Sequence, residues 1–559
     1  MLSKIQLRKK QSSLDKKEAL VDKILFLETN SEFYSFFRNM YLTLGRLCND
    51  ILYFNRRENY FKYGKDKMNQ MLLKLIAKEK PDYVFTWLTW DEFYIDTLLK
   101  INEISPKTKT VVILGDDTIQ FEDFSRYYAL LFNCVFTTLK SYQKRYKEEG
   151  IKDVYFTSLT DATNFHPIKT EKKYDVTFIG SQKLDKAGRY EMIKYLKDNG
   201  ISVKVFGFGW ENYPEIKDVY GGPLESDQVV KVTNESKINL CFSKDNIGRP
   251  QMKAKIFEVG ACNSFTLCEY APDYDNYFDE GKDIVFFKNQ EELLNKVKYY
   301  LAHDKEREKI AKAAYSRVVR EYALQTELKN FIKSTRNKIK KVRLPELGKS
   351  VHCMTSSEID LGTEKLKNLV AKYDYVSFKT SKAEHLKYKD YFQIYGLIKS
   401  GKHISCCNYY MHSGLLGDYM LFFTRDGAAL LDKQAFNSML DINQLVVSKD
   451  YFLENYLQLK QAFHGKTIDF VNKDTTTFVA IPLVRLRKLK TKNYEVLKKA
   501  FGFKFIYRLY ASFFQKKFLV DPFTYALLFQ SLTTKRFIMR ALRDNLKDKN
   551  IWAKFKKLK

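Results

Sequence analysis

Short apolar runs alternate, along the first part of the chain, with segments whose apolar residues recur every three or four positions. The run Thr108–Leu114 has the length and composition of a buried strand, whereas Glu32–Leu47 has the spacing of an amphipathic helix. Strands that alternate with helices in this way predict a parallel sheet in a doubly wound α/β domain. The strands expected here are Lys23–Glu28, Asp50–Phe54, Pro81–Trp87, Thr108–Leu114, Cys134–Thr137 and Val154–Thr157.

The same alternation continues beyond residue 165. A strand at Asp175–Ile179 precedes a helix at Gly188–Asn199, and a helix at Lys253–Gly260 precedes a strand at Phe265–Cys268. A basic stretch with Pro and Gly at Arg336–Lys349 then marks a boundary. We therefore expect four parts, namely residues 1–165, 166–340, 350–490 and 491–559.

The third part has α/β character without a topology that the pattern settles. Strands are expected at Tyr373–Phe378, His403–Asn408, Thr467–Val471 and Thr477–Leu483, with a helix at Tyr388–Ser400. It contains neither a DxD sequence nor a glycine-rich phosphate loop. The mixture of strands and helices suggests a remnant or divergent sugar-handling domain.

Charge points to anionic partners. The chain has 96 Lys and Arg against 67 Asp and Glu, a formal net charge of +29, which favours nucleotide phosphates, nucleic acid or an anionic membrane surface. Known nucleic-acid-binding signatures are missing, so we expect no specific nucleic acid. The eight cysteines form no CxxC pair, and the polar N-terminus does not resemble a signal peptide. We therefore expect a cytoplasmic protein.

The stretch from Gln251 to Asp283 carries the most suggestive chemistry. Lys253 and Lys255 open an expected helix, Glu258 follows one turn later, and Glu269 ends the next strand. Lysines can meet phosphates while a carboxylate accepts hydrogen bonds from ribose hydroxyls, so this unit could seat a nucleoside diphosphate. The alternative is an ordinary αβ unit with a solvated charged face.

The same stretch resembles the donor-binding segment of GT-B glycosyltransferases, and most closely that of the CgeB-like (spore maturation protein) family. The pattern of that family runs roughly Q-x-K-x-[RK]-x-F-E-x-x-A-C, and the sequence here reads QMKAKIFEVGAC. Further pieces match in order, including Phe178–Ser181 followed by Arg189, and Val205–Gly207 followed by Trp210. The resemblance covers about residues 20–335.

The resemblance implies a GT-B fold of two Rossmann-like domains, with the acceptor side in residues 1–165 and the nucleotide-sugar donor side in residues 166–340. It implies that Glu258 binds the ribose of the donor. Retaining relatives carry a further acid eight positions before this glutamate, where this chain has Pro250. The retaining mechanism of that type is therefore in doubt.

Several other residues are candidates for donor binding. Gly180 and Ser181 follow a strand, so that their backbone amides could approach phosphate, or they form a plain turn. Gly207 precedes Trp210, which could stack on a base or only pack. The complete set expected at the donor is Gly180, Ser181, Arg189, Gly207, Trp210, Arg249, Lys253, Lys255, Glu258 and Glu269.

Asp116 and Asp117 follow the expected strand Thr108–Leu114, at the edge where open α/β sheets bind ligands. One of them could act as the general base toward an acceptor hydroxyl. The alternative is an N-cap for the next helix. The histidines lack HxH and HExxH spacing, so we expect no metal site and no cofactor.

These patterns favour a metal-independent glycosyltransferase that moves a sugar from a nucleotide-diphosphate sugar to a glycan, lipid-linked or protein acceptor. The alternative is a non-catalytic carbohydrate- or nucleotide-binding scaffold with the same fold. Residues 501–520 are aromatic and basic. A helix there could contact the inner face of an anionic membrane, or could pack as ordinary core.

Overall fold

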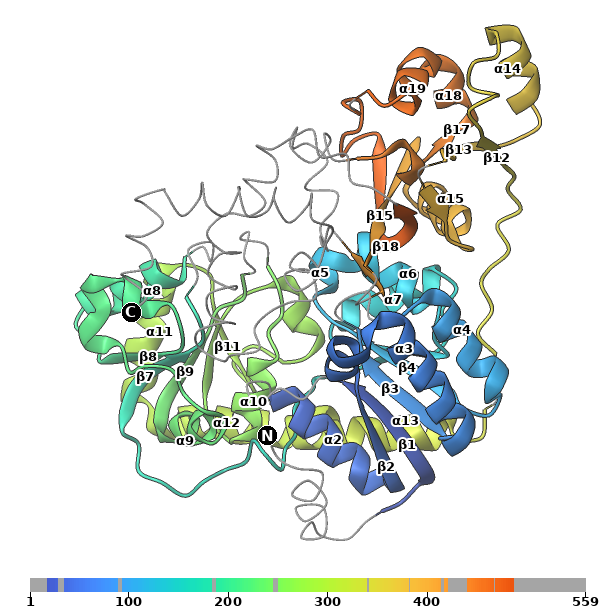
Figure 1. Ribbon diagram of the computed structural model, residues 1–559. Helices are drawn as coiled ribbons and strands as arrows, with labels where there is room; N and C mark the ends of the chain where they lie inside the picture. Colours follow the sequence, from blue (N-terminus) through green and yellow to red (C-terminus); the bar gives the residue numbers. More distant parts are fainter. Residues whose placement is uncertain are drawn as a thin grey trace.

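The computed structural model describes residues 18–28, 35–88, 93–182, 188–244, 250–338, 341–381, 383–413, 417–420, 440–466 and 468–486. They form three α/β domains (Figure 1). The expected tail, residues 491–559, lies outside the described residues.

The first domain is built on a parallel sheet of six strands in the order β2-β1-β3-β4-β5-β6. Its strands are β1 (Val21–Glu28), β2 (Cys48–Asn55), β3 (Tyr83–Trp87), β4 (Lys109–Leu114), β5 (Cys134–Thr137) and β6 (Val154–Phe156). Its helices are α2 (Ser35–Leu47), α3 (Arg56–Glu79), α4 (Ile95–Ile104), α5 (Asp117–Gln120), α6 (Arg126–Ala129) and α7 (Lys140–Glu148).

Alternate residues of these strands enter two separate cores. Leu25 and Val84 pack under α3 and α4, whereas Phe26 and Phe85 pack on the opposite face of the sheet. A strand buried on both faces reads as a continuous apolar run, which is why β4 was recognisable from the sequence. The doubly wound arrangement expected for this domain is therefore present.

The second domain repeats the scheme with five parallel strands in the order β11-β10-β9-β7-β8. The strands are β7 (Tyr174–Ile179), β8 (Val203–Phe206), β9 (Ser236–Cys241), β10 (Thr266–Glu269) and β11 (Val285–Phe287). The helices are α8 (Arg189–Asp198), α9 (Ser226–Glu235), α10 (Lys255–Ala261), α11 (Gln290–Ala302) and α12 (Asp304–Arg317).

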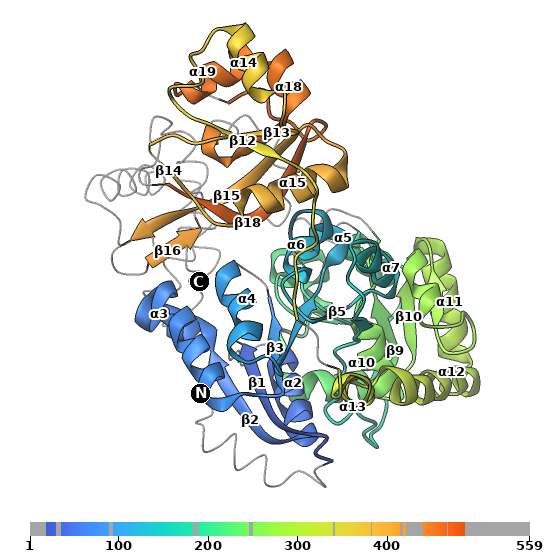
Figure 2. The same cartoon turned by 90° about the vertical axis from the view of Figure 1, so that its right-hand side faces the viewer.

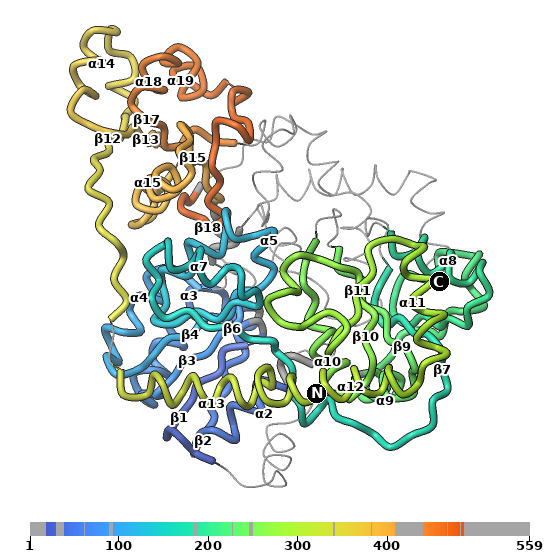
Figure 3. The backbone as a smooth tube through the Cα atoms, turned by 180° about the vertical axis from the view of Figure 1, so that it is seen from behind, coloured from blue at the N-terminus to red at the C-terminus, as the bar shows by residue number. Residues whose placement is uncertain are grey.

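The chain then returns to the first domain through α13 (Leu324–Thr335). Figure 3 shows α13 and α12 in succession, with α13 crossing the first domain and α12 lying along the second. Phe331 of α13 packs against Tyr83 and Phe85 of the first sheet, with ring centroids 5.7 and 5.9 Å away. Two Rossmann-like domains joined by such a returning helix make up the GT-B fold.

The third domain has a mixed sheet in the order β12-β13-β17-β15-β18-β14, with β16 beside β15. The strands are β12 (Val351–Met354), β13 (Tyr375–Phe378), β14 (Ala383–His385), β15 (Ile404–Ser413), β16 (Gly417–Met420), β17 (Leu445–Ser448) and β18 (Thr476–Leu486). The helices are α14 (Thr363–Val370), α15 (Lys389–Ser400), α18 (Lys449–Glu454) and α19 (Tyr456–Phe463). The strand expected at Thr467–Val471 is wrong, because the described residues 468–471 have no strand structure.

The third domain packs on the first rather than standing apart from it (Figure 2). One hydrophobic core contains Leu25 and Tyr127 of the first domain together with Phe392 and Tyr395 of α15. Gly396 allows this approach, since a Cβ atom there would lie 2.6 Å from the Tyr127 hydroxyl oxygen.

A buried ionic group fastens the same interface. Glu149 of the first domain pairs with Arg126 at 2.9 Å and with Lys399 of α15 at 3.2 Å, and it accepts a hydrogen bond from the Tyr395 hydroxyl. Its carboxylate is thus shared between the two domains. The described linker between them, residues 341–350, has no helix or strand.

Candidate active site

Segments that follow strands of the two parallel sheets meet at the junction of the first and second domains. Gln251, just before α10, donates a hydrogen bond through its amide nitrogen to the Asp116 carboxylate, 3.1 Å away. Asp116 follows β4 of the first domain and Gln251 belongs to the second, so this contact spans the two halves. Open α/β sheets bind ligands at the carboxyl ends of their strands.

Two cations converge on the end of β7. The Arg189 guanidinium donates to the Ser181 carbonyl at 2.9 Å, and the Lys255 ammonium donates to the Ile179 carbonyl at 2.8 Å. Burial lowers the pKa of both side chains. Because these charges are poorly solvated, an anion placed beside them gains more than it would at an exposed surface. The expected donor residues Arg189 and Lys255 are thus brought together.

Glu258 lies one helical turn after Lys255 on α10. Burial raises the pKa of its carboxyl group, and the positive charge of Lys255 opposes that rise. Among the described residues, its carboxylate has neither a hydrogen-bond nor a salt-bridge partner. It is therefore a partly buried acceptor available to a ligand that brings its own donors, such as a pair of hydroxyl groups.

The loop after β7 differs from the one expected. The amides of Gly180 and Gln182 donate to the carbonyls of Phe206 and Phe208 at 2.8 and 2.9 Å. The expectation that the Gly180 amide meets phosphate is therefore corrected, since that donor is already used. In an extended chain the residue between them faces the other way, which leaves the Ser181 backbone on the side of the Arg189 side chain.

The loop after β8 packs closely against the loop after β7. Gly207 and Gly209 have φ values of 126° and 93°, and a Cβ atom at Gly209 would lie 1.7 Å from the Gln182 carbonyl oxygen. Trp210 is 0% exposed and donates its indole N–H to the Gly180 carbonyl at 2.7 Å. Of the two roles open to Trp210, packing is the one observed, and its expected stacking on a base is corrected. The donor contact expected of Gly207 stays a prediction.

Glu269 is buried and contacts the loop that follows β9. Its two carboxylate oxygens accept from the Ser243 amide at 3.1 Å and pair with the Lys244 ammonium at 2.9 Å, and the residue is 5% exposed. The carboxylate holds the loop that follows β9. The expected direct contact between Glu269 and the donor is corrected to this supporting role.

Lys253 extends the contact across the junction. Its ammonium donates to the side-chain carbonyl of Gln251, and its amide donates to the Tyr274 hydroxyl at 3.2 Å. Lys253, Gln251 and Asp116 therefore form a continuous chain of hydrogen bonds from the second domain to the first. Sequence reasoning missed Gln251 as a site residue, although it opens the motif on which the resemblance depends.

The two neighbouring aspartates have different roles. Asp116 is exposed and adopts a left-handed conformation with φ of 56°. Asp117 is 1% exposed and accepts hydrogen bonds from Thr137 at 2.7 Å and Tyr146 at 2.9 Å, and burial raises its pKa to about 6. The expectation that Asp117 reaches reacting groups is corrected, and Asp116 is the aspartate that faces the junction.

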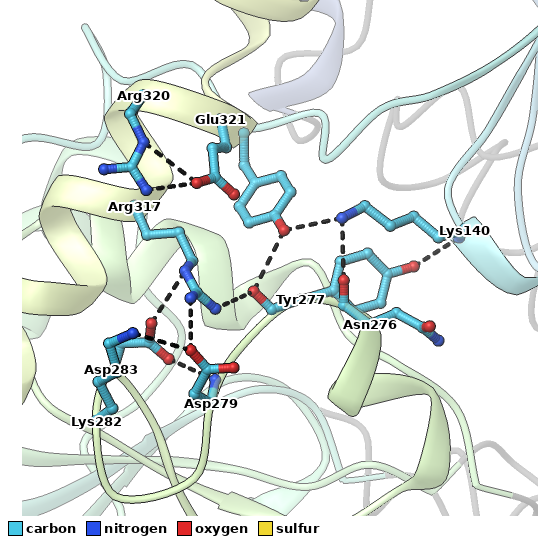
Figure 4. A network of polar contacts seen from close by, with 10 residues as sticks. Lys140, Asn276, Tyr277, Asp279, Lys282, Asp283, Arg317, Arg320 and Glu321 are labelled. Atoms are coloured by element: carbon cyan, nitrogen blue, oxygen red, sulfur yellow. Dashed lines mark hydrogen bonds and ion pairs between the residues drawn. The ribbon is translucent and has the colours of Figure 1, made fainter.

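A network of polar contacts joins the first and second domains near Lys140 (Figure 4). Lys140 of α7 donates from its ammonium to the Asn276 carbonyl at 3.0 Å and to the Tyr322 hydroxyl at 2.9 Å. Its amide donates to the Tyr277 hydroxyl at 2.6 Å. Lys140 therefore ties the first domain to the second, and no sequence motif marks it.

The two chain segments that connect the halves lie side by side. The Leu324 amide donates to the Thr160 carbonyl at 2.8 Å. The Ser158 amide donates to both carboxylate oxygens of Glu327, at 3.0 and 3.2 Å, and burial raises the pKa of Glu327 to about 8. These hydrogen bonds join the two connecting segments where the chain passes between the domains.

Some expectations fall outside this description. Arg249 lies outside the described residues, as does the aromatic segment 501–520 with its expected membrane contact. Over the described part of the chain, no group of three or more His, Cys, Asp and Glu residues could hold a metal ion. No helix within the same residues is long and apolar enough to cross a membrane.

Comparison with known proteins bears on the half that carries this site. Residues 189–333 match the family described as Glycosyl transferase-like. The chain is 23% identical over 266 residues to Spore protein CgeB of Bacillus subtilis (strain 168), an alignment that covers 44% of this chain and 72% of that protein. The resemblance to CgeB-like glycosyltransferases is confirmed.

Solved structures with similar folds include Anabaena Alr3699/HepE in complex with UDP, which is 12% identical with a TM-score of 0.42 and covers 56% of this chain and 99% of its own. A glycosyltransferase from Rickettsia africae ESF-5 is 12% identical with a TM-score of 0.42, covering 58% of this chain and 100% of its own.

Proposed function

We propose that this protein transfers a sugar from a nucleotide-diphosphate sugar to a hydroxyl group of a glycan or lipid-linked acceptor. The observation that carries the proposal is the convergence of Arg189 and Lys255 on the end of β7, within the segment that matches a glycosyltransferase family. Two desolvated cations at a strand end favour a ligand with a concentrated negative charge, such as a diphosphate.

In this proposal each side chain has a distinct task. Lys255 and Arg189 hold the diphosphate and offset the charge that it gains as the glycosidic bond breaks. Glu258 accepts hydrogen bonds from the ribose hydroxyls, because its carboxylate has no other partner among the described residues. These contacts fix the nucleotide at the carboxyl edge of the second sheet.

Asp116 is the proposed general base toward the acceptor. It belongs to the first domain, it is exposed, and Gln251 orients one of its oxygens from the donor side. A carboxylate can take the proton of an attacking hydroxyl if it lies within hydrogen-bond reach of it. The bond to Gln251 therefore couples the position of the base to the domain that binds the donor.

We further propose that transfer is independent of divalent metal ions. Cationic side chains can stabilise a departing diphosphate in the way that a metal ion would. Arg189 and Lys255 supply two positive charges where the diphosphate is proposed to bind.

Release of nucleoside diphosphate from a panel of UDP-, GDP- and ADP-sugars, measured in EDTA with and without added glycans, tests the proposal. We expect one donor to be turned over in EDTA, and Asp116→Asn to abolish turnover while donor binding persists. Turnover that requires manganese would contradict metal independence. Failure of every donor to bind would contradict the proposed function itself.

A further inference from the structure

A cavity of about 390 Å³ lies between the first and third domains, away from the donor residues. One wall comes from α3 and the start of α4, and the other comes from the segment joining β14 to α15 together with the end of β18. In Figure 2 the third domain lies above α3 and α4.

The two domains that form the walls of this cavity are joined by tertiary contacts. The two domains share a hydrophobic core, in which Tyr127 packs against Phe392 and Tyr395 with ring centroids 6.3 and 6.0 Å apart. The Glu149 ionic group fastens the same contact. Cavities that bind ligands are usually preformed at such domain boundaries.

The lining combines ring surfaces with hydrogen-bonding groups of both kinds. Tyr94 and Tyr388, both partly exposed, contribute aromatic rings from opposite walls. Asp96 and Gln70 contribute exposed acceptors, and Lys387 contributes an exposed donor. Amphipathic rings with amides and charged groups suit a ligand that has apolar faces and many hydroxyl groups.

The charged side chains that line the cavity indicate which class of ligand it could bind. The lining holds the carboxylates Asp66 and Asp96 against the cations Lys100, Lys387 and Arg485. Arg485 is paired with Glu384 at 2.7 Å. The signs nearly balance, although the whole chain has a net charge of +29. A neutral ligand is therefore favoured over a polyanion in this cavity.

The cavity also lies at the correct edge of the first sheet. Its lining residues Phe93 to Thr97 follow β3, and β3 is the neighbour of β4, the strand that leads to Asp116. The carboxyl ends of adjacent parallel strands share one edge. An extended chain bound in the cavity could thus direct one end toward the proposed base.

From this juxtaposition we infer that the cavity between the first and third domains is a subsite for a neutral glycan, which holds the acceptor chain at a distance from its reacting end. The inference rests on the proposed function, because it gives the acceptor its class and its path. It assigns the third domain a role in acceptor recognition.

Direct titration with neutral hexasaccharides tests the inference. The probes are maltohexaose, cellohexaose, laminarihexaose and chitohexaose at up to about 5 mM, with a heparin hexasaccharide as the anionic comparator. We expect at least one neutral probe to bind, and Tyr388→Ala and Gln70→Ala each to weaken it by about fivefold or more. Tyr299→Ala is the matched control, since it removes a 45% exposed tyrosine from α11.

Two results would overturn the inference, namely no binding of any neutral probe, or binding that both lining variants leave unchanged. Heparin binding that is abolished by salt and unaffected by the variants is expected from the general charge. Thermal shift with nucleotide sugars is recorded for the same samples. If a nucleotide sugar raises the melting temperature but no neutral glycan binds, only the subsite is rejected. If a glycan binds but no nucleotide sugar raises the melting temperature, the proposed function is rejected.

Discussion

Glu258 is the residue through which the ribose assignment can be tested. Its carboxylate has no hydrogen-bond or salt-bridge partner among the described residues, so Glu258→Ala breaks no such bond that they provide. We expect nucleotide-sugar binding to weaken by about 1–3 kcal/mol, as for a lost charge-assisted hydrogen bond. Calorimetric titration measures this loss, with Glu291→Ala on the exposed start of α11 as the control.

A donor with a 2′,3′-dideoxyribose distinguishes the loss of a ribose contact from a nonspecific loss of donor affinity. If Glu258 binds the ribose hydroxyls, the alanine variant and the parent protein bind the dideoxy donor with similar affinity. An equal loss with both donors would contradict the assignment.

Asp117 predicts a specific pH dependence. Its pKa is raised from 3.8 to about 6 in the folded protein, so the folded state retains a proton that the unfolded state has lost between these values. The stability contribution of Asp117 therefore falls as the pH rises through this window. The Asp117→Asn variant has no carboxyl group at this position and does not lose stability in this way. Its free energy of unfolding relative to that of the parent should therefore rise by up to about 3 kcal/mol between pH 4 and 6.5.

Thermal unfolding of parent and variant across this pH range provides the measurement. A stability difference that does not change with pH would contradict the raised pKa of Asp117. The sequence could not distinguish Asp117 from Asp116, because the distinction depends on Thr137 and Tyr146, which approach from β5 and α7.

At the scale of elements, the loop after β8 sets the shape of the loop after β7. Gly209→Ala would place a Cβ atom 1.7 Å from the Gln182 carbonyl oxygen. Gly200→Ala is a matched control, since its φ of 78° is also positive but nothing lies within 4 Å of the added atom. Both variants have the backbone cost of about 1–2 kcal/mol, and only Gly209→Ala has the clash in addition.

We expect Gly209→Ala to lower the melting temperature more than Gly200→Ala and to weaken donor binding, because it displaces the segment that Arg189 contacts. Equal melting temperatures and equal donor affinities in the two variants would contradict this role of the loop.

The strands of the two parallel sheets were predictable because they are buried on both faces and read as apolar runs. Cys134–Thr137 was located to the residue. Helix α9 (Ser226–Glu235) was missed, since its sequence is largely polar and its capping box involves Glu225, an uncommon N-cap. In the third domain, the short strand β17 (Leu445–Ser448) was missed, because it pairs antiparallel between β13 and β15, contacts that local patterns do not encode.

The residues proposed to contact the donor could be predicted from the sequence only in part. Lys255 and Glu258 follow from the helix motif, and Arg189 follows from the resemblance. The supporting roles of Trp210 and Glu269 depend on which way their side chains turn, and spacing along the chain does not determine that.

At the scale of the whole molecule, Glu149 should hold the third domain to the first. Its removal takes away the acceptor of Lys399 and Tyr395 of α15. It also leaves Arg126, whose side chain is 6% exposed, without one of its partners. Breaking a buried ion pair costs about 3–5 kcal/mol. We expect Glu149→Ala to loosen the third domain and to accelerate proteolysis in the linker, residues 341–350.

Glu122→Ala is the matched control. Glu122 pairs with the same arginine at 2.8 Å, but its side chain is 55% exposed and it does not contact the third domain through a hydrogen bond or ion pair that the structure describes. Digestion rates that are the same in both variants would contradict a structural role for Glu149 at the interface.

The central claim is that the end of β7 binds the diphosphate of a nucleotide sugar. Calorimetric titration in EDTA tests it most directly. The nucleoside diphosphate and the corresponding nucleoside are each titrated into the parent protein and into the variants Lys255→Met and Lys312→Met. Lys312 lies exposed on α12 and serves as the control. The account predicts that Lys255→Met weakens diphosphate binding by about 1.5–3 kcal/mol and leaves nucleoside binding and the control unchanged. Diphosphate affinity that is equal in the parent and in Lys255→Met would contradict it.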